Sequence, residues 1–237
     1  MLHSKYIISA CLALFVLFLS MGCHSLRTEN DKPVSQQPTP QESAQKLSEE
    51  ETKLRIGPGD PVVGKTKAEL CFGCHGEDGN SASPEFPKLA GQYGSYIAKQ
   101  IRNFQATTRT HQVMGAMAAA VSDEDLADIA AYFASQPIMK GDHPSDNKIG
   151  KNLFENDDLP RMLVRCSNCH GATGKGQNPG NPMYPVIGGQ HKEYLLAQLL
   201  NFRKGARNNS PGGVMNTIVH RLSDAELEAL ADYVSGL

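Results

Sequence analysis

Apolar residues recur at positions i, i+3, i+4 and i+7 in two segments that lie 101 residues apart, which is the spacing of one face of an α-helix. The first segment carries the pattern on Leu126, Ile129, Ala130 and Phe133, and the second on Leu227, Leu230, Ala231 and Val234. A serine precedes each segment, with an acidic residue three positions later: Ser122 with Asp125, and Ser223 with Glu226. This is the spacing of a capping box, so the pattern predicts a closing helix in each half of the chain.

A second pair of matching segments predicts another helix in each half. Residues 86–104 read FPKLAGQYGSYIAKQIRNF and residues 184–202 read YPVIGGQHKEYLLAQLLNF, at an offset of 98 residues. Their shared positions recur at helical spacing: Tyr96, Ile97, Gln100, Ile101 and Phe104 in the first, and Tyr194, Leu195, Gln198, Leu199 and Phe202 in the second. Weaker periodicity predicts a short helix over about 60–70 and another over about 147–155.

No segment alternates apolar and polar residues as a half-buried strand would. The matched segments therefore predict an all-α fold that is built from one duplicated unit. We place the two copies at residues 57–138 and 139–237.

The N-terminus has the pattern of an export signal. Lys5 precedes 17 uncharged residues, YIISACLALFVLFLSMG, which suit the core of a signal peptide and are short for a membrane span. The run ends at Cys23, and LSMGC resembles a bacterial lipoprotein signal, although Ser20 and Met21 depart from the usual residues. We expect a signal peptide over residues 1–22 and lipidation of Cys23. Cleavage by an ordinary signal peptidase, an uncleaved anchor and an unmodified Cys23 thiol are the alternatives.

Residues 23–56 differ in composition from the signal and from the repeats. They are rich in Ser, Gln, Glu and Pro and lack aliphatic periodicity, so they cannot bury enough apolar surface to form a core. We predict a flexible tether with a reach of roughly 30 Å. With the signal, it indicates a periplasmic protein that is attached to the membrane through its N-terminus.

Composition and charge are those of an ordinary globular protein. The chain has 237 residues, 40% of them hydrophobic, and a formal net charge of −2, which does not favour nucleic acid as a partner. Residues 57–138 carry six basic and nine acidic side chains, whereas residues 139–237 carry eleven and ten. This difference, and the basic cluster Arg203, Lys204 and Arg207, predict that two partners dock at opposite ends of the molecule.

Four of the six cysteines lie in two motifs, CFGCHG at residues 71–76 and CSNCHG at residues 166–171. C-x-x-C-H is the signature of covalent haem attachment in c-type cytochromes. Two thiols at this spacing add to the two vinyl groups on one edge of the porphyrin and direct the adjoining histidine at the iron. The predicted thioether residues are Cys71, Cys74, Cys166 and Cys169, and the predicted histidine ligands are His75 and His170. Gly76 and Gly171 would let the chain turn away close to the ring.

Other uses of paired cysteines fit less well. Structural zinc sites commonly place their two pairs about 15–20 residues apart and do not need both histidines, whereas these pairs lie 95 residues apart. A thioredoxin-like pair requires a βαβ context, and no strand is predicted here. A disulfide within each pair would close a short, strained loop. The motifs therefore favour two haem c groups.

The repeat also singles out one methionine in each half as a second iron ligand. Met114 and Met215 occupy equivalent positions, each nine residues before the first aspartate of the closing helix, in segments that we predict to be loops. Met117 is the rival in the first half, but it aligns with Ile218. The other candidates lack a counterpart in the repeat: Met183, His111, His143, His191 and His220. A single methionine is usually a core residue, but two at matched positions favour ligation.

These motifs together resemble the dihaem cytochrome c4 family over residues 57–237. The resemblance rests on both CxxCHG motifs, FPKLAGQ, the methionines before each SD pair, and the AAYF and ADYV endings. It implies two class I cytochrome c domains that pack about a pseudo-twofold axis, with the haem propionate edges near their interface. It implies that Met114 and Met215 are axial ligands, and that Pro87 and Pro185 accept a hydrogen bond from the axial histidines. The long N-terminal segment departs from the family.

An iron bound by both imidazole and thioether has no open position, and the thioether raises its potential. We therefore predict electron transfer rather than catalysis, from a quinol-oxidising complex or a dehydrogenase to an acceptor such as a terminal oxidase. One alternative is a cytochrome subunit that is permanently docked in a membrane redox complex. Another is a dihaem enzyme, such as a peroxidase or a thiosulfate dehydrogenase, which would need an open or unusual sixth position.

Overall fold

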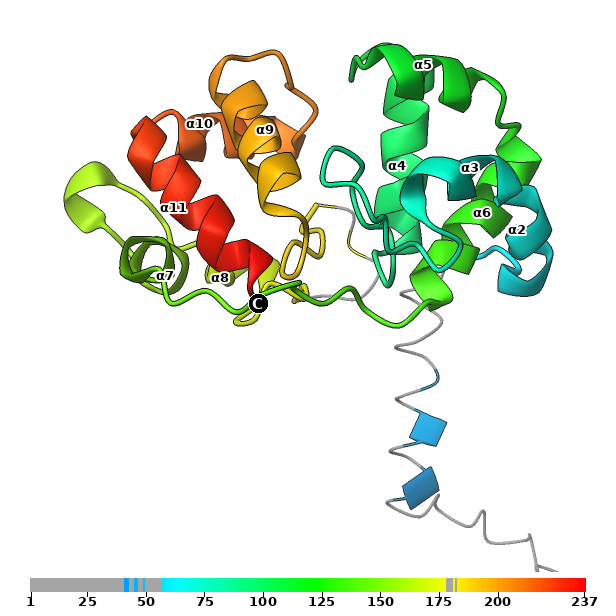
Figure 1. The fold of residues 1–237 in the computed structure, drawn as a ribbon, viewed down its shortest axis with the longest axis horizontal. Coiled ribbons are helices and arrows are strands. Elements are labelled where there is room, and N and C mark those ends of the chain that lie inside the picture. The colour runs from blue at the N-terminus through cyan, green and yellow to red at the C-terminus, as the bar shows by residue number, and fades with distance from the viewer. Residues whose placement is uncertain (1–40, 43–44, 47–48, 50–56, 178–180, 182) are drawn as a thin grey trace, which may run out of the picture. The chain divides into compact units, whose positions relative to one another are not determined.

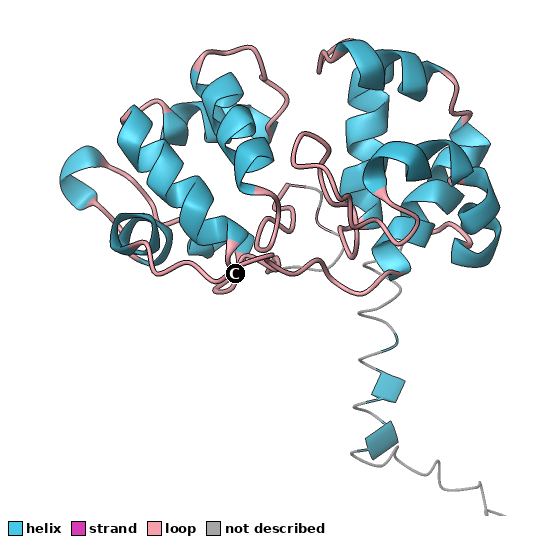
Figure 2. Ribbon diagram, viewed as in Figure 1, coloured by secondary structure: helices cyan, strands magenta, loops and turns pink. Residues whose placement is uncertain are grey.

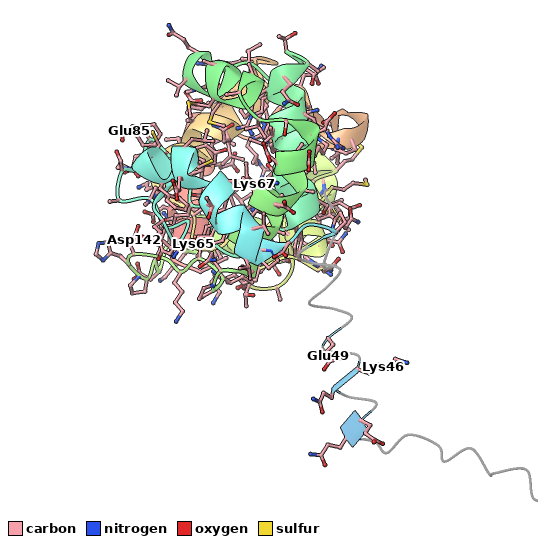
Figure 3. The ribbon with its side chains drawn as sticks, turned by 90° about the vertical axis from the view of Figure 1, so that its right-hand side faces the viewer. Lys46, Glu49, Lys65, Lys67, Glu85 and Asp142 are labelled. Carbon is pink, nitrogen blue, oxygen red and sulfur yellow. The ribbon has the colours of Figure 1, made fainter. Side chains whose placement is uncertain are left out.

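The computed structural model describes residues 41–42, 45–46, 49, 57–177, 181 and 183–237. The predicted signal peptide, Cys23 and most of the predicted tether lie outside the described residues. Five tether residues are described as helical and exposed, among them Lys46 and Glu49 (Figure 3). No helix within the described part of the chain is long and apolar enough to cross a membrane.

Helices make up each half of the described chain (Figure 1). The first half holds α2 (Pro61–Lys67), α3 (Glu69–His75), α4 (Gly94–Gln105), α5 (Gln112–Ala119) and α6 (Asp123–Ser135). The second half holds α7 (Lys148–Glu155), η1 (Leu159–Arg161), α8 (Ser167–His170), α9 (Lys192–Arg203), η2 (Pro211–Gly213), α10 (Val214–Val219) and α11 (Asp224–Ser235).

The prediction of an all-α fold is confirmed. Figure 2 shows helices and connecting loops over the described residues, which contain no strand and a single isolated bridge between Asp158 and Leu163. The segments predicted over about 60–70 and 147–155 form α2 and α7, and the two pairs of strongly periodic segments form α4 with α9 and α6 with α11.

The capping signals of the two closing helices are realised to different extents. At α11, the Ser223 side chain accepts from the Glu226 amide and the Glu226 carboxylate accepts from the Ser223 amide, which is a complete capping box. At α6, Ser122 accepts from the Asp125 amide, but the Asp125 carboxylate pairs with Lys67 of α2 at 2.8 Å. Lys67, labelled in Figure 3, also pairs with Asp128 at 2.8 Å. Asp125 therefore ties α2 to α6 rather than closing the box.

Each closing helix supplies the centre of one hydrophobic core. In the first half, Leu126, Ile129 and Phe133 of α6 are at most 2% exposed. In the second half, Leu227 and Val234 of α11 are equally buried and pack with Phe154 of α7. A third, smaller cluster joins residues from both halves: Ala90, Tyr93, Met139 and Val186.

A glycine lets the first helix of each half cross the closing helix at backbone contact. A Cβ atom built on Gly64 of α2 would lie 2.0 Å from the Asp128 carbonyl oxygen of α6, and one on Gly150 of α7 would lie 2.0 Å from the Ala229 carbonyl oxygen of α11. These distances leave no room for a methyl group. The two crossings are equivalent in the repeat, so the same close approach shapes both halves.

We expect Gly150→Ala to destabilise the second half by about 1–3 kcal/mol, the usual cost of forcing an extra carbon into packed structure. Lys151→Ala on the same helix is the matched control, because Lys151 is exposed. Urea unfolding of both variants with haem bound measures the difference. Equal midpoints for Gly150→Ala and Lys151→Ala would show that the α7–α11 crossing tolerates the methyl group.

Candidate functional site

Helices α3 and α8 carry the cysteine–histidine motifs. His75 ends α3 and His170 ends α8, and each side chain is buried. Burial raises the pKa of Cys71 to about 11 and that of Cys166 to about 12, while Cys74 is exposed. The first thiol of each pair is therefore a neutral, half-buried group at a cavity wall, and the histidine lies one turn further along the same helix.

A proline carbonyl fixes each histidine ring. The Nδ1 atom of His75 lies 2.8 Å from the Pro87 carbonyl oxygen, and that of His170 lies 2.9 Å from the Pro185 carbonyl oxygen. Since a carbonyl only accepts, Nδ1 carries the proton and the Nε2 lone pair is left for a metal. Burial lowers the pKa of both histidines by more than these hydrogen bonds raise it, so both rings stay neutral near pH 7.

The glycine after each histidine is also required for a reason that the prediction did not include. Gly76 and Gly171 do turn the chain at φ of 80° and 82°, values that favour glycine. A Cβ atom on Gly76 would lie 2.6 Å from the Asn80 carbonyl oxygen, and one on Gly171 would lie 2.4 Å from the Gly176 carbonyl oxygen. The loop that follows each motif thus comes too close for a side chain, in addition to any constraint from the porphyrin.

A cavity of about 530 Å³ brings the predicted site residues together. It is lined by all four motif cysteines, both motif histidines, both prolines and both matched methionines: Cys71, Cys74, Cys166, Cys169, His75, His170, Pro87, Pro185, Met114 and Met215. Apolar side chains such as Ile97, Phe104, Leu195 and Phe202 complete the walls. Thiols, a neutral imidazole and apolar walls are the donor set and surface that a covalently held haem needs, so the residues present fit this cofactor.

The matched methionines lie in short helices, and the prediction that they lie in loops is wrong. Met114 is in α5 and Met215 is in α10, and both side chains are half-buried. The Met114 amide donates to His111 Nδ1 at 3.3 Å, and the Met215 amide donates to Ser210 Oγ at 3.2 Å. A side chain from the preceding turn thus holds each methionine's backbone. Met117 and Met183 also line the cavity.

Sequence reasoning missed a polar network that joins the two halves beside the cavity. The Arg109 guanidinium donates to Gln100 of its own half at 2.8 Å, and to Tyr194 and Gln198 of the other half at 2.9 and 3.0 Å. The Arg207 guanidinium reverses this pattern: it donates to Gln198 of its own half at 2.9 Å, and to Tyr96 and Gln100 of the other half at 2.9 and 3.3 Å.

The two arginines of this network occupy equivalent positions in the repeat, 98 residues apart. Each guanidinium also lies over a phenylalanine ring, Arg109 at 4.7 Å from the Phe104 centroid and Arg207 at 4.4 Å from that of Phe202. The salt bridges between described residues include neither arginine. The shared offset of 98 residues in the sequence could have identified Arg109 and Arg207 as an equivalent pair.

The prediction of a basic docking cluster is wrong for Arg207. Only 7% of Arg207 is exposed, and its guanidinium is taken up by the network between the halves. Arg203 pairs with Asp224 and donates to the Leu222 carbonyl, so its charge is largely compensated. Lys204 alone of the three is exposed without such a role. The basic cluster in the sequence thus includes one residue that is buried in the structure. Counting charges along the sequence does not show which side chains are exposed.

Comparison with known proteins agrees with this geometry. The family model for cytochrome c matches residues 61–137 and 148–237. A cytochrome c4 of Azotobacter vinelandii is 39% identical over 197 residues, which span 78% of this chain and 93% of the relative. A thiosulfate dehydrogenase electron acceptor of Stutzerimonas stutzeri is 33% identical over 175 residues, which span 72% of this chain and 80% of the relative.

A solved structure extends the likeness to three dimensions. The crystal structure of reduced recombinant cytochrome c4 from Pseudomonas stutzeri matches with a TM-score of 0.70 and 38% identity, over 76% of this chain and 100% of that one. The fold and the site therefore define a tandem cytochrome c with one haem c in each domain. Within that class, the chain belongs to the cytochrome c4 family.

We expect Arg207→Gln to weaken the contact between the two domains. The shorter side chain leaves the Tyr96 hydroxyl without the Arg207 donor, while Gln100 and Gln198 keep their bonds from Arg109. A buried polar group without its partner costs about 1–3 kcal/mol. Calorimetry of the protein with haem bound would then resolve two unfolding transitions or show a lower midpoint. Lys204→Gln removes the same charge from the surface and is the control. Identical thermograms for the two variants would refute a structural role for Arg207.

Proposed function

We propose that the chain carries electrons between respiratory proteins and that eight side chains hold its two haem groups. In the first domain, Cys71 and Cys74 form the thioether bonds, and His75 and Met114 are the axial ligands. In the second domain, Cys166, Cys169, His170 and Met215 have the same roles. The observation that carries the proposal is the arrangement of these residues, in equivalent positions of the repeat, around the walls of one cavity.

The ligands that we propose determine what the site does. Each bound haem supplies an iron that cycles between Fe(III) and Fe(II). His75 with Met114, and His170 with Met215, would bind the iron of each haem and would leave no position for oxygen or a small substrate. The methionine sulfur favours Fe(II), while the proline carbonyl keeps the histidine in one tautomer and orientation. An iron with no open coordination position is typical of an electron carrier, and it argues against an enzyme that binds its substrate at the iron.

The residues at the interface between the two domains favour electron transfer from one haem to the other. The interface network places the buried guanidinium group of Arg207 and the half-buried one of Arg109 beside the cavity, and no carboxylate of the described residues forms a salt bridge with either. Haem carries two propionate groups, which are carboxylates. We propose that the propionate edges face Arg109 and Arg207, so that the cofactors approach each other at the interface.

For the donor, we propose a quinol-oxidising complex or a dehydrogenase, and for the acceptor a terminal oxidase. The similarity to a thiosulfate dehydrogenase electron acceptor supports a dehydrogenase as donor. A permanently docked subunit of a membrane redox complex is the second candidate, because the N-terminal segment would keep the domains near a membrane. A dihaem enzyme is a weaker candidate, since matched methionines leave neither iron open.

We propose that the protein works in the periplasm and is attached to the membrane through Cys23. The support is the sequence alone: a charged start, an apolar run of 17 residues and a cysteine at its end, followed by a polar segment. This arrangement would let the two domains move within reach of membrane complexes without dissociating.

The ligand assignment is tested by Met114→Ala in the full protein with both haems. Because only one sulfur ligand is removed, the near-infrared sulfur-to-iron charge-transfer band should fall by about half, and carbon monoxide should bind one reduced haem. The unmodified protein should bind none. Met117→Ala is the matched control, since Met117 lines the same cavity.

A band that halves in Met117→Ala but not in Met114→Ala would reassign the ligand. Carbon monoxide binding to the unmodified protein would reveal an open iron and would favour an enzyme over a carrier.

We expect Cys23→Ser to release the mature cytochrome from the membrane fraction while both haems remain bound. Without the thiol, no lipid can be added at this position. Sedimentation of the membranes and mass spectrometry of the mature N-terminus measure the outcome. A variant that still sediments with the membranes would point to an uncleaved N-terminal anchor.

A further inference from the structure

Two buried glutamines, Gln92 and Gln190, each bind the backbone of the opposite domain. Gln92 Oε1 accepts from the Val186 amide at 3.0 Å, and Gln92 Nε2 donates to the Val186 carbonyl at 2.7 Å. Gln190 Oε1 accepts from the Lys88 amide at 2.8 Å, and Gln190 Nε2 donates to the Lys88 carbonyl at 2.9 Å. Only 4% of Gln92 and 5% of Gln190 are exposed, so water does not compete for these bonds.

These glutamines end the FPKLAGQ segment and its counterpart YPVIGGQ, 98 residues apart. Gly91 and Gly189, which precede them, have φ of 66° and 82°. Their amides donate to carbonyls near the ends of the closing helices, Phe133 at 2.9 Å and Val234 at 3.0 Å. The glycine turn therefore rests on the domain's own core and directs the glutamine across the interface.

The residue that each glutamine binds directly follows the proline that holds a haem histidine. The Pro87 carbonyl and the Lys88 amide belong to one peptide group: the carbonyl accepts from His75 at 2.8 Å, and the amide donates to Gln190. The Pro185 carbonyl and the Val186 amide form the same kind of group between His170 and Gln92. A continuous chain of hydrogen bonds thus runs from each histidine, through one peptide group, to the other domain.

A peptide group transmits polarisation because its carbonyl and amide share delocalised electrons. A hydrogen bond from the amide places more negative charge on the carbonyl oxygen, which strengthens the bond that this oxygen accepts. A stronger bond at Nδ1 makes the imidazole a better electron donor to a metal at Nε2. More electron donation stabilises Fe(III) over Fe(II) and lowers the reduction potential.

We propose that Gln92 and Gln190 are positioning residues for the haem of the opposite domain. Gln190 sets the orientation and basicity of His75 through Pro87, and Gln92 does so for His170 through Pro185. Each domain thereby adjusts the potential of its neighbour's haem. The inference rests on the proposed function, because it requires His75 and His170 to be the iron ligands.

The test replaces each glutamine with methionine, which has a similar length but whose thioether is only a weak acceptor for the amide. Haem-methyl NMR signals, assigned to each domain and followed through a redox titration, report the two potentials separately. Gln190→Met should raise the potential of the first-domain haem more than that of the second. Gln92→Met should raise the potential of the second-domain haem more than that of the first.

Tyr93→Phe is the control for a general weakening of the interface. The Tyr93 hydroxyl lies 3.5 Å from the Lys175 carbonyl oxygen of the other domain, and Tyr93 does not line the haem cavity. This variant should leave both potentials unchanged. Larger shifts in the glutamine's own domain, or equal shifts in both domains, would overturn the proposal.

Glutamate variants provide a second test in case a methionine variant does not bind both haems. Gln190→Glu and Gln92→Glu retain an oxygen opposite the amide, so the potential of the opposite haem should fall rather than rise. A rise would overturn the proposal. If the glutamine variants keep normal sulfur-to-iron bands and show unshifted potentials, only the role of the glutamines is rejected. If the unmodified protein lacks those bands, the proposed function is rejected.

Discussion

The hydrogen bond between each motif histidine and a proline carbonyl is the interaction on which the rest of the site depends. It joins the end of a short helix, α3 or α8, to a loop 12 or 15 residues further along the chain. It fixes the tautomer that presents Nε2 to a metal, and burial keeps the ring neutral. Helices α4 and α9, which line the cavity, follow these loops along the chain.

Duplication explains why the interface between the domains is reciprocal. A residue that reaches across from the first domain has an equivalent that reaches back from the second, as Arg109 and Arg207 do, and as Gln92 and Gln190 do. Such an interface uses one set of contacts twice and closes on itself. It also places the candidate haem sites of both domains next to the same polar network.

The two copies of the repeat differ in some of the side chains that bind equivalent backbone positions. Ser223 completes a capping box, whereas Asp125 of the first copy turns to Lys67. His111 holds the amide of Met114, whereas Ser210 holds that of Met215. At the closing helices, a serine caps both copies and only the use of its acidic partner differs. At the methionines, two different side chains, His111 and Ser210, hold the equivalent amide.

The sequence by itself determined the helical fold, the duplication and the chemistry of the motifs. Amphipathic spacing, the C-x-x-C-H signature and matched offsets depend on neighbours in the chain, which can be counted without coordinates. Only the tertiary structure decided that Arg207 is interior, that Met114 and Met215 lie in helices, and that Gln92 and Gln190 cross to the other domain. Burial and hydrogen-bond partners depend on residues about 100 positions away, and their side chains meet only when both domains have folded.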